Sequence, residues 1–366
     1  DVGLAIELLT DMLRAPTFAS DEFTKLRDRR VDLIRAAKDN NLTGLLPLYG
    51  AAWLFGDHPY GTAVDGDETS LANIRHRDLL GFYEDFVGAD RLIVSVVGDI
   101  DAPAVIGALT EAFADWRPAA QPLPEITAAE PQAGRRVLLV DKPGAAQSVI
   151  RIGGVGVPRS TPDYFAIQVL NTILGGNMSS RLFQNIREKR GLAYSIYSFL
   201  TAYADTGMFG VCTAVDPKNT NACIDLIMEQ VRRLKKTPLS AEALQDAKEF
   251  TKGNLLMAEE SPDNQMVRLA QNEFYFDGYI PMQSVIDNID AVAADDLLGL
   301  AEDRWGSGQA ALTMLGPCEQ CASAVQVALT QAGFQVREVD GHGGGRQLAR
   351  HLNPGGAGTA EESGFG

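Results

Sequence analysis

Two side chains that could act on a peptide carbonyl lie seven residues apart in the sequence GGNMSSRLFQNIREKRGLAYSIYS, residues 175–198. Arg187 forms a cluster of cations with Lys189 and Arg190, and Tyr194 lies three residues after Gly191. A guanidinium and a phenol both donate hydrogen bonds. Together they could hold a carbonyl oxygen, or the oxyanion that forms when that carbonyl is attacked. Arg187 and Tyr194 are therefore the candidate catalytic and substrate-binding residues.

The elements expected to position this pair are a helix that ends at Gly191 and a strand that follows directly. Glycine suits the left-handed residue after a helix, and cations in the last turn complement the helix dipole by about 0.3 to 1 kcal/mol each. That effect already accounts for the other two cations of the cluster. Regular alternation along the strand predicts Tyr194 on the same face as Leu192 and Ile196. Arg187 and Tyr194 are then expected to converge across the helix–strand corner.

Composition excludes several classes of function. The chain has 366 residues, of which 45% are hydrophobic and 22% charged, as in ordinary globular proteins with room for two domains. A net charge of -16 repels phosphate backbones and anionic lipid, which argues against nucleic-acid and membrane-surface roles. No apolar run reaches the roughly 18 residues that a membrane span needs. The four cysteines leave the redox compartment open.

An internal repeat predicts the fold class. DLLGFYEDFVGADRLIVSVVG, residues 78–98, matches DLLGLAEDRWGSGQAALTMLG, residues 296–316, without a gap at an offset of 218 residues. AIELLTDML at residues 5–13 matches CIDLIMEQV at residues 223–231 with the same offset. We therefore expect an α+β fold with two homologous α/β-sandwich-type domains. The offset also implies that roughly 80 residues of the first copy are absent, so the first domain is expected to be truncated at its N-terminus.

Pro-rich and Gly-rich segments suggest where the two copies end. The predicted first domain covers residues 1–118, a Pro- and Ala-rich linker covers 119–135, and the second domain covers 136–340. Residues 341–366 have too few apolar side chains to fold and are predicted to be a disordered tail. Strands are expected at residues 135–141, 146–157, 192–202 and 207–215, and near 91–98 in the first copy.

Residues 175–198 closely resemble the second-half signature of the insulinase/pitrilysin-type zinc metallopeptidases, the inverzincin family that includes mitochondrial processing peptidase. GDHPYG at residues 56–61, followed by DLLGFYEDF and VVGDID, resembles the closing part of that family's first half. The resemblance covers roughly residues 4–335. It implies two halves or two subunits that close around unfolded peptide. It also implies that Arg187 and Tyr194 match the family's substrate-binding Arg and Tyr, which act opposite a zinc site.

The zinc ligands that the resemblance implies do not all have a match. A catalytic zinc needs three protein ligands and one open position. The family supplies two histidines and a general base from H-x-x-E-H, and a glutamate roughly 75 to 80 residues later. The resemblance implies that H-x-x-E-H lies in the absent N-terminal part. No histidine in the present sequence has a second one three or four residues away. The histidines are His58, His76, His342 and His351.

The position of the third ligand is more informative. In a gapless comparison it falls on Arg35, and the family's earlier acid falls on Asp28. An arginine cannot bind zinc. Asp32 would replace it only if the helix slipped by three residues, which turns a side chain by about 300°. The first half is therefore not expected to bind zinc.

These observations predict a subunit of a zinc metalloendopeptidase, because some members of the family work as pairs in which one subunit holds the zinc. This chain is expected to bind extended peptide through Arg187 and Tyr194, in a hetero- or homodimer whose other subunit carries the zinc. Two alternatives stay open: a self-sufficient peptidase with H-x-x-E-H in its N-terminal part, and a non-catalytic structural homologue. The compartment stays open as well, although the resemblance to bacterial relatives suggests a periplasmic or secreted protein.

Three further motifs are expected to be structural. Cys318 and Cys321 form a Cys-x-x-Cys that could join Cys212 and Cys223 in a metal site, but in the repeat it replaces the helix-capping sequence DIDA. His58 lies in a turn beside a proline and is expected to hold that turn. GGVG at residues 153–156 lacks the strand-to-helix setting of a phosphate-binding loop.

Overall fold

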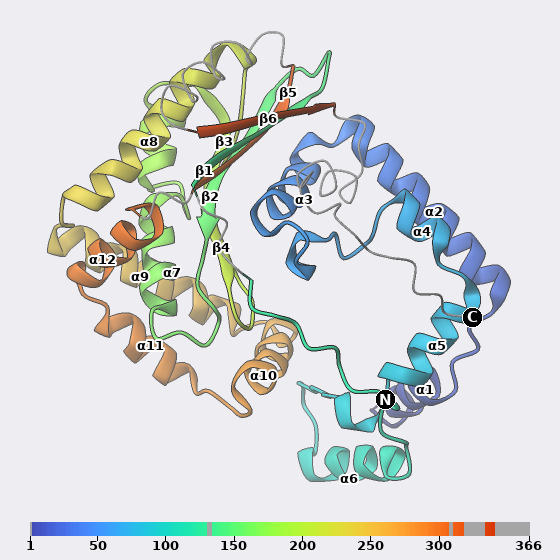
Figure 1. Ribbon diagram of the computed structural model, residues 1–366. Coiled ribbons are helices and arrows are strands. Elements are labelled where there is room, and N and C mark those ends of the chain that lie inside the picture. Colours follow the sequence, from blue (N-terminus) through green and yellow to red (C-terminus); the bar gives the residue numbers. More distant parts are fainter. Residues whose placement is uncertain (1, 130–133, 307–309, 318–333, 341–366) are drawn as a thin grey trace. The chain divides into compact units, whose positions relative to one another are not determined.

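The computed structural model describes residues 2–129, 134–306, 310–317 and 334–340, in which the chain folds as two separate units (Figure 1). Unit 1 consists of Asp1–Leu33, Glu68–Thr127 and Gly253–Ser284. Unit 2 consists of Ile34–Asp67, Ala128–Lys252 and Val285–Gly366. The domain boundary proposed from the repeat stays a prediction, and the expected tail at residues 341–366 lies outside the described residues.

Unit 2 is organised around a mixed sheet whose six described strands have the order β3-β4-β2-β5-β1-β6 (Figure 1). β1 runs parallel to β5 and β6, and the other neighbours are antiparallel. The strands expected in the second copy are confirmed. They are β1 (Arg135–Asp141), β2 (Ser148–Val155), β3 (Ala193–Ala202) and β4 (Gly207–Val215). The sheet also contains β5 (Ala310–Gly316) and β6 (Phe334–Asp340), which were not among the strands expected above.

Helices cover both faces of this sheet. α7, α8 and α12 lie on one side and α3 lies on the other (Figure 1). The helices with most of their length in unit 2 are α3 (Leu42–Phe55), α7 (Tyr164–Leu174), α8 (Thr220–Lys236), α9 (Ala241–Ala258), α11 (Met282–Ala291) and α12 (Ala294–Gly306). Short helical turns are η1 (Pro59–Gly61), η3 (Phe183–Glu188) and η4 (Pro217–Asn219).

Burial on both faces explains why the strand sequences are nearly continuous in apolar residues. Val137 and Leu139 of β1 are fully buried, and so are Leu138 and Val140, which point toward α3. A strand with both faces covered has no polar side to alternate with. On the α3 side, these strand residues form a hydrophobic cluster that also contains Trp53. The guanidinium carbon of Arg136 lies 4.0 Å from the centroid of the Trp53 ring.

Unit 1 is helical in the residues that the structure describes. Its helices are α1 (Val2–Arg14), most of α2 (Ser20–Asn40), α4 (Glu68–Asn73), α5 (His76–Phe86), η2 (Ala89–Arg91), α6 (Ala102–Phe113) and α10 (Pro262–Phe276). Arg14 joins α1 to the end of α6, because its Nη1 donates to the Ala112 carbonyl at 2.6 Å and its Nη2 lies 2.8 Å from the Asp115 carboxylate.

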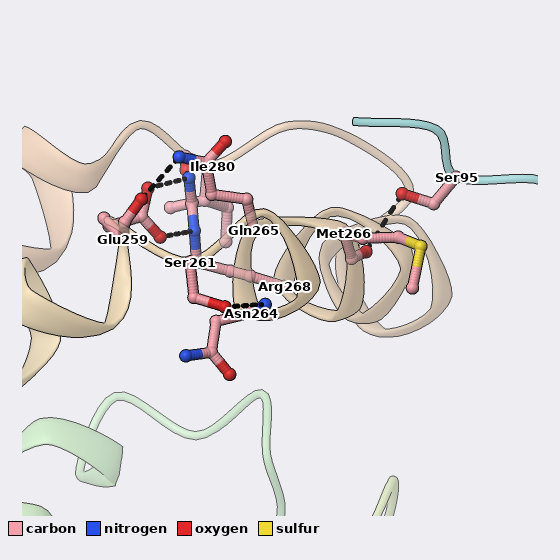
Figure 2. Close-up of polar contacts among 8 residues, drawn as sticks. All are labelled: Ser95, Glu259, Ser261, Asn264, Gln265, Met266, Arg268 and Ile280. Carbon is pink, nitrogen blue, oxygen red and sulfur yellow. Dashed lines mark hydrogen bonds and ion pairs between the residues drawn. The ribbon is translucent and has the colours of Figure 1, made fainter. Parts of the chain in front are cut away.

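The prediction of a strand near residues 91–98 is wrong. Residues Leu92–Val97 form no strand, although their counterpart in the repeat, β5, pairs with β1 on one side and β2 on the other. A strand needs a partner, and the described residues of unit 1 offer none. The hydroxyl of Ser95 instead donates to the Met266 carbonyl of α10 at 2.9 Å (Figure 2).

An ion pair fastens the turn between α9 and α10 (Figure 2). Arg268 contacts both carboxylate oxygens of Glu259, at 2.6 and 3.0 Å, and also donates to the Ile280 carbonyl at 2.9 Å. Ser261 caps α10 by accepting from the backbone N–H of Asn264. The start of α10 is therefore fixed both to the end of α9 and to the segment that leads into α11.

The observed mixture of helices and a single mixed sheet confirms the predicted α+β class. In the described residues, no helix has both the length and the apolar character that a bilayer crossing requires.

Candidate functional site

The helix before Gly191 ends in a π-helical turn, η3. The backbone N–H of Lys189 donates to the Gln184 carbonyl, five residues earlier, at 3.1 Å. Gly191 has a φ of 61°, and its N–H donates to the Arg187 carbonyl at 2.9 Å. The N–H of Leu192 reaches back to Ile186 at 3.1 Å. The prediction of a left-handed glycine at the helix end is confirmed, and these hydrogen bonds hold the start of β3 against the helix.

The cations of this turn differ in what they contact. Arg190 donates from Nη1 to the Asn185 carbonyl at 2.6 Å, which satisfies one of the last carbonyls of the helix. Arg187 stacks with its guanidinium carbon 4.6 Å from the centroid of the Phe183 ring. Its Nε is 4.0 Å from the Glu188 carboxylate, and 43% of its side chain is exposed. Arg190 thus caps the helix, whereas the guanidinium of Arg187 is accessible to a ligand.

Tyr194 occupies a β-bulge. The register of β3 against β4 shifts between Ala193 and Ser195, so Tyr194 is the extra residue. The expected alternation that placed Tyr194 and Ile196 on one face is therefore wrong: Tyr194 is 78% exposed, whereas Ile196 is 4% exposed. A bulge redirects side chains and is common beside active sites. Here it leaves the phenol of Tyr194 exposed between Ala193, which is buried, and Ser195, which is half-buried.

Close contacts with α7 fix β3 in place. Ser198 donates from its hydroxyl to the Asn171 carbonyl at 3.0 Å, and its N–H donates to the Gly175 carbonyl at 3.2 Å. A Cβ added to Gly175 would lie 2.3 Å from the backbone nitrogen of Ser198, so only glycine permits this approach. The GGN sequence that opens the motif thus supports the strand that carries Tyr194. The structure places Arg187 and Tyr194 on either side of Gly191, and their joint action on one ligand stays a prediction.

A row of side chains that was not predicted from the sequence crosses the same sheet. Arg151 of β2 pairs with Cys212 of β4, which in turn pairs with Tyr197 of β3. Arg151 is 8% exposed, and its guanidinium carbon lies 3.6 Å from the centroid of the Phe199 ring. The signal in the sequence that could have identified this residue was an arginine within the apolar strand sequence SVIRIGGV. A charge is rare at that place in a strand buried on both faces.

The donors in the described residues do not fit a catalytic zinc. The Nδ1 atom of His58 accepts from the backbone N–H of Tyr60 at 3.2 Å, and the Nε2 atom of His76 is hydrogen-bonded to the Phe18 carbonyl. These two histidines lie in different units. Asp28 pairs with Arg27 at 3.0 Å on α2. Within the described ranges, no group of three His, Cys, Asp or Glu side chains could hold a metal ion. His342 and His351 lie outside those ranges.

The cysteines do not form a shared site in the described residues. The Cys212 thiol lies 4.0 Å from Arg151, while the Cys223 thiol lies 3.9 Å from the hydroxyl of Thr213. Cys212 and Thr213 are consecutive in β4 and point to opposite faces, so the two thiols are separated by the sheet. Burial raises the pKa of Cys223 to about 11, which keeps it protonated at neutral pH. Cys318 and Cys321 lie outside the described residues.

Comparisons with known proteins agree on one group of proteins, the zinc proteases and their inactive domains. The family described as "Peptidase M16 inactive domain" matches residues 73–250. The chain is 27% identical over 316 residues to the uncharacterized zinc protease YmxG of Bacillus subtilis, covering 86% of this chain and 75% of that protein. It is 30% identical over 325 residues to the uncharacterized zinc protease ML0855 of Mycobacterium leprae, covering 87% and 71%.

Solved structures show the same fold. A peptidase M16 inactive domain from Pseudomonas fluorescens superposes with a TM-score of 0.75 at 24% identity, covering 86% of this chain and 74% of that one. A protease from Helicobacter pylori gives 0.77 at 21% identity, covering 86% and 76%. A chain of complex III2 from Candida albicans gives 0.74 at 15% identity, covering 87% and 77%.

Proposed function

The chain belongs to the peptidase M16 family, the insulinase-like peptidases, and on that premise we propose that it binds extended peptide as a subunit of a zinc metalloendopeptidase. The observation that carries the proposal is the accessibility of two hydrogen-bond donors around Gly191. The π-helical turn and the bulge leave Arg187 and Tyr194 exposed at the junction of η3 and β3, while Ile186 of η3 and Ile196 of β3 are buried.

The proposed role of the pair is to hold the carbonyl of the bond that is cut. The guanidinium of Arg187 and the phenol of Tyr194 donate hydrogen bonds to the carbonyl oxygen and then to the oxyanion that replaces it. Each such donor contributes on the order of 10²- to 10³-fold in kcat where it has been measured in other enzymes. The pair also orients the bound peptide, so that its scissile carbonyl is already positioned when the water attacks.

The zinc is proposed to lie on a partner subunit. Arg35 stands where the family has its third ligand, and the described histidines are engaged in backbone contacts. Members of the family often pair as subunits, which supports a homologous, zinc-bearing partner. Because this chain is proposed to lack the zinc, the pair is a heterodimer rather than a homodimer. The partner would supply the activated water, and this chain would supply substrate binding.

Metal analysis and one substitution test the proposal. The full-length protein purified alone is expected to contain no stoichiometric zinc, and the assembled pair is expected to contain one zinc per pair. Tyr194→Phe should lower peptide cleavage by the pair by about 10²- to 10³-fold, while its assembly, measured by size-exclusion chromatography with light scattering, stays unchanged. This variant loses the hydroxyl group but keeps the aromatic ring and its packing. Unchanged turnover in that variant would rule out the role of Tyr194.

A second candidate is a self-sufficient zinc peptidase, favoured by the names of the similar proteins, which are zinc proteases. It predicts one zinc per chain in the full-length protein purified alone, and cleavage without a partner. A purely structural role, as a third possibility, predicts no cleavage under either condition. The same metal and turnover measurements therefore separate all three.

A further inference from the structure

Arg151 is a buried cation in the middle of the sheet of unit 2. The residue is 8% exposed and lies in β2, between β4 and β5. A Cβ added to Gly50 of α3 would lie 2.5 Å from its Cδ atom, so α3 closes tightly over the side chain. Removing a guanidinium from water is costly, and buried charges in proteins are normally paired with an opposite charge or bind a ligand.

The contacts of Arg151 are soft and apolar. Its Nη2 atom is 3.6 Å from the sulfur of Met208, and its Nη1 atom is 4.0 Å from the sulfur of Cys212. Its guanidinium carbon also lies 3.6 Å from the centroid of the Phe199 ring. Sulfur is a weak acceptor, and a guanidinium has five N–H donors. Most of the hydrogen-bonding capacity of Arg151 is thus unused in the described residues.

No negative charge faces Arg151 within the described residues. The titratable groups that act on it are Cys212, Tyr197 and Tyr203. Burial raises the pKa of the Cys212 thiol and of both phenols, so all three are neutral at neutral pH. No Asp or Glu side chain forms an ion pair with Arg151 in these parts of the chain. The guanidinium therefore has the charge and the free donors to bind an anion.

A small cavity of about 10 Å³ lies beside the guanidinium. This is close to the space that one water molecule needs, and a single carboxylate oxygen is of similar size. Glycines form much of the wall and leave this room. The lining includes Gly50, Gly153, Gly154, Phe199 and Thr313.

One wall of the cavity is Phe199 of β3, the strand that also carries Tyr194. Cys212 links Arg151 to Tyr197 across β4, and Tyr197 follows Tyr194 by three residues in β3. Tyr197 is 42% exposed, so the row extends from the buried guanidinium toward solvent on the strand that carries Tyr194. A peptide held by Tyr194 would lie near the open end of this row.

We propose that Arg151 is a specificity-determining residue that binds a carboxylate of the peptide, an inference that rests on the proposed peptide-binding function. The carboxylate is either an acidic side chain or the C-terminus, and one of its oxygens enters the cavity. A guanidinium binds carboxylates through short, charge-assisted hydrogen bonds. Because the chain has a net charge of -16, an anionic ligand is otherwise repelled and depends on this local cation.

Binding of labelled peptides tests the inference. Fluorescence anisotropy on the full-length protein, with its partner bound, compares peptides with Glu or Gln at each position in turn, and peptides with a free or amidated C-terminus. The wild type should prefer one carboxylate form about tenfold, which corresponds to about 1.4 kcal/mol. The pair of peptides that shows the preference identifies which carboxylate is bound.

Three variants assign the preference to Arg151. Arg151→Met keeps an unbranched chain beside the sulfur atoms and should remove the preference without removing peptide binding. Arg151→Lys keeps the charge and should retain part of it. Arg136→Met is the matched control, because Arg136 also stacks on an aromatic ring but donates to the Trp53 carbonyl at 2.7 Å, and it should keep the full preference.

The outcomes separate this inference from the proposed function. Tight but equal binding of both peptide forms by the wild type overturns the role of Arg151 and leaves peptide binding intact. An undiminished preference in Arg151→Met also overturns it. No binding of any peptide overturns both proposals. If Arg151→Met does not fold, Arg151→Lys decides the question, because an undiminished preference in that variant overturns the role of Arg151.

Discussion

Gly191→Ala isolates the backbone strain at the corner between η3 and β3. Gly191 has a φ of 61°, a conformation that costs an L-residue about 1 to 2 kcal/mol. A Cβ at this position meets no atom within 4 Å, so no steric clash adds to that cost. The substitution also reduces the entropy of the unfolded chain, which offsets about 0.4 to 1 kcal/mol. The net loss in the free energy of unfolding should be about 1 kcal/mol.

Thermal unfolding followed by circular dichroism measures this loss, with an expected fall in Tm of about 2 to 4 °C. Gly299→Ala is the matched control, because Gly299 lies within α12 of the same unit and also has open space around its Cα. Alanine is the better helix former there and should stabilise by about 0.5 to 1 kcal/mol. Gly191→Asn should lose less than Gly191→Ala, since asparagine tolerates the left-handed region. If Gly191→Ala is as stable as the wild type, the strain assigned to this corner is wrong.

Two further predictions concern stability. Burial raises the pKa of Cys223 from 9.0 to about 11, so the folded chain keeps a proton that the unfolded chain releases. This contribution to stability is complete below pH 9 and should be lost, by about 2 to 3 kcal/mol, as the pH rises through 11. Cys223→Ala should flatten that part of the stability curve, and an unchanged slope would contradict the assignment. Glu259→Gln breaks the two-bond contact with Arg268 and should cost about 1 to 2 kcal/mol. Glu229→Gln, which breaks an exposed pair with Arg233, should cost less than about 0.5 kcal/mol, so equal losses would contradict the importance of burial.

The sequence was sufficient to predict strands β1 to β4 of unit 2 because their signals are local. The run RRVLLVD is apolar at consecutive positions, which suits a strand covered on both faces, and β1 is such a strand. Gly191 was predictable for the same reason, since a glycine between a helical segment and an apolar alternation is typical of a left-handed helix end. Both features depend on residues that are close together in the chain.

The orientation of Tyr194 depends on a distant strand and was not predictable. Regular alternation holds only where two strands pair one residue to one, and β4 pairs with β3 with one extra residue at Tyr194. Nothing in the sequence LAYSIYS marks the bulge. The strand expected at residues 91–98 fails for a related reason, because its existence requires partner strands that the described residues of unit 1 do not provide.

The surroundings of Arg151 were a third feature that the sequence could not predict. The sequence identifies a charge inside an apolar strand, but it does not reveal which side chains from β4 and α3 meet that charge. The contacts with Cys212, Met208 and Gly50 come from segments more than 50 residues away in the chain. The unused donors of this arginine became visible only when those contacts were known.

A double-mutant cycle on Arg187 and Tyr194 tests the central proposal most directly. The kcat/KM for peptide cleavage by the assembled pair is measured for Arg187→Met, Tyr194→Phe and the double variant, with Lys189→Met as the control from the same turn. If both donors hold one carbonyl oxygen, each single variant loses on the order of 10²- to 10³-fold, and the double variant loses much less than the product. A coupling energy of at least about 1 kcal/mol is expected, with the control close to wild type. Losses that simply multiply, or no loss in either single variant, would contradict a shared carbonyl.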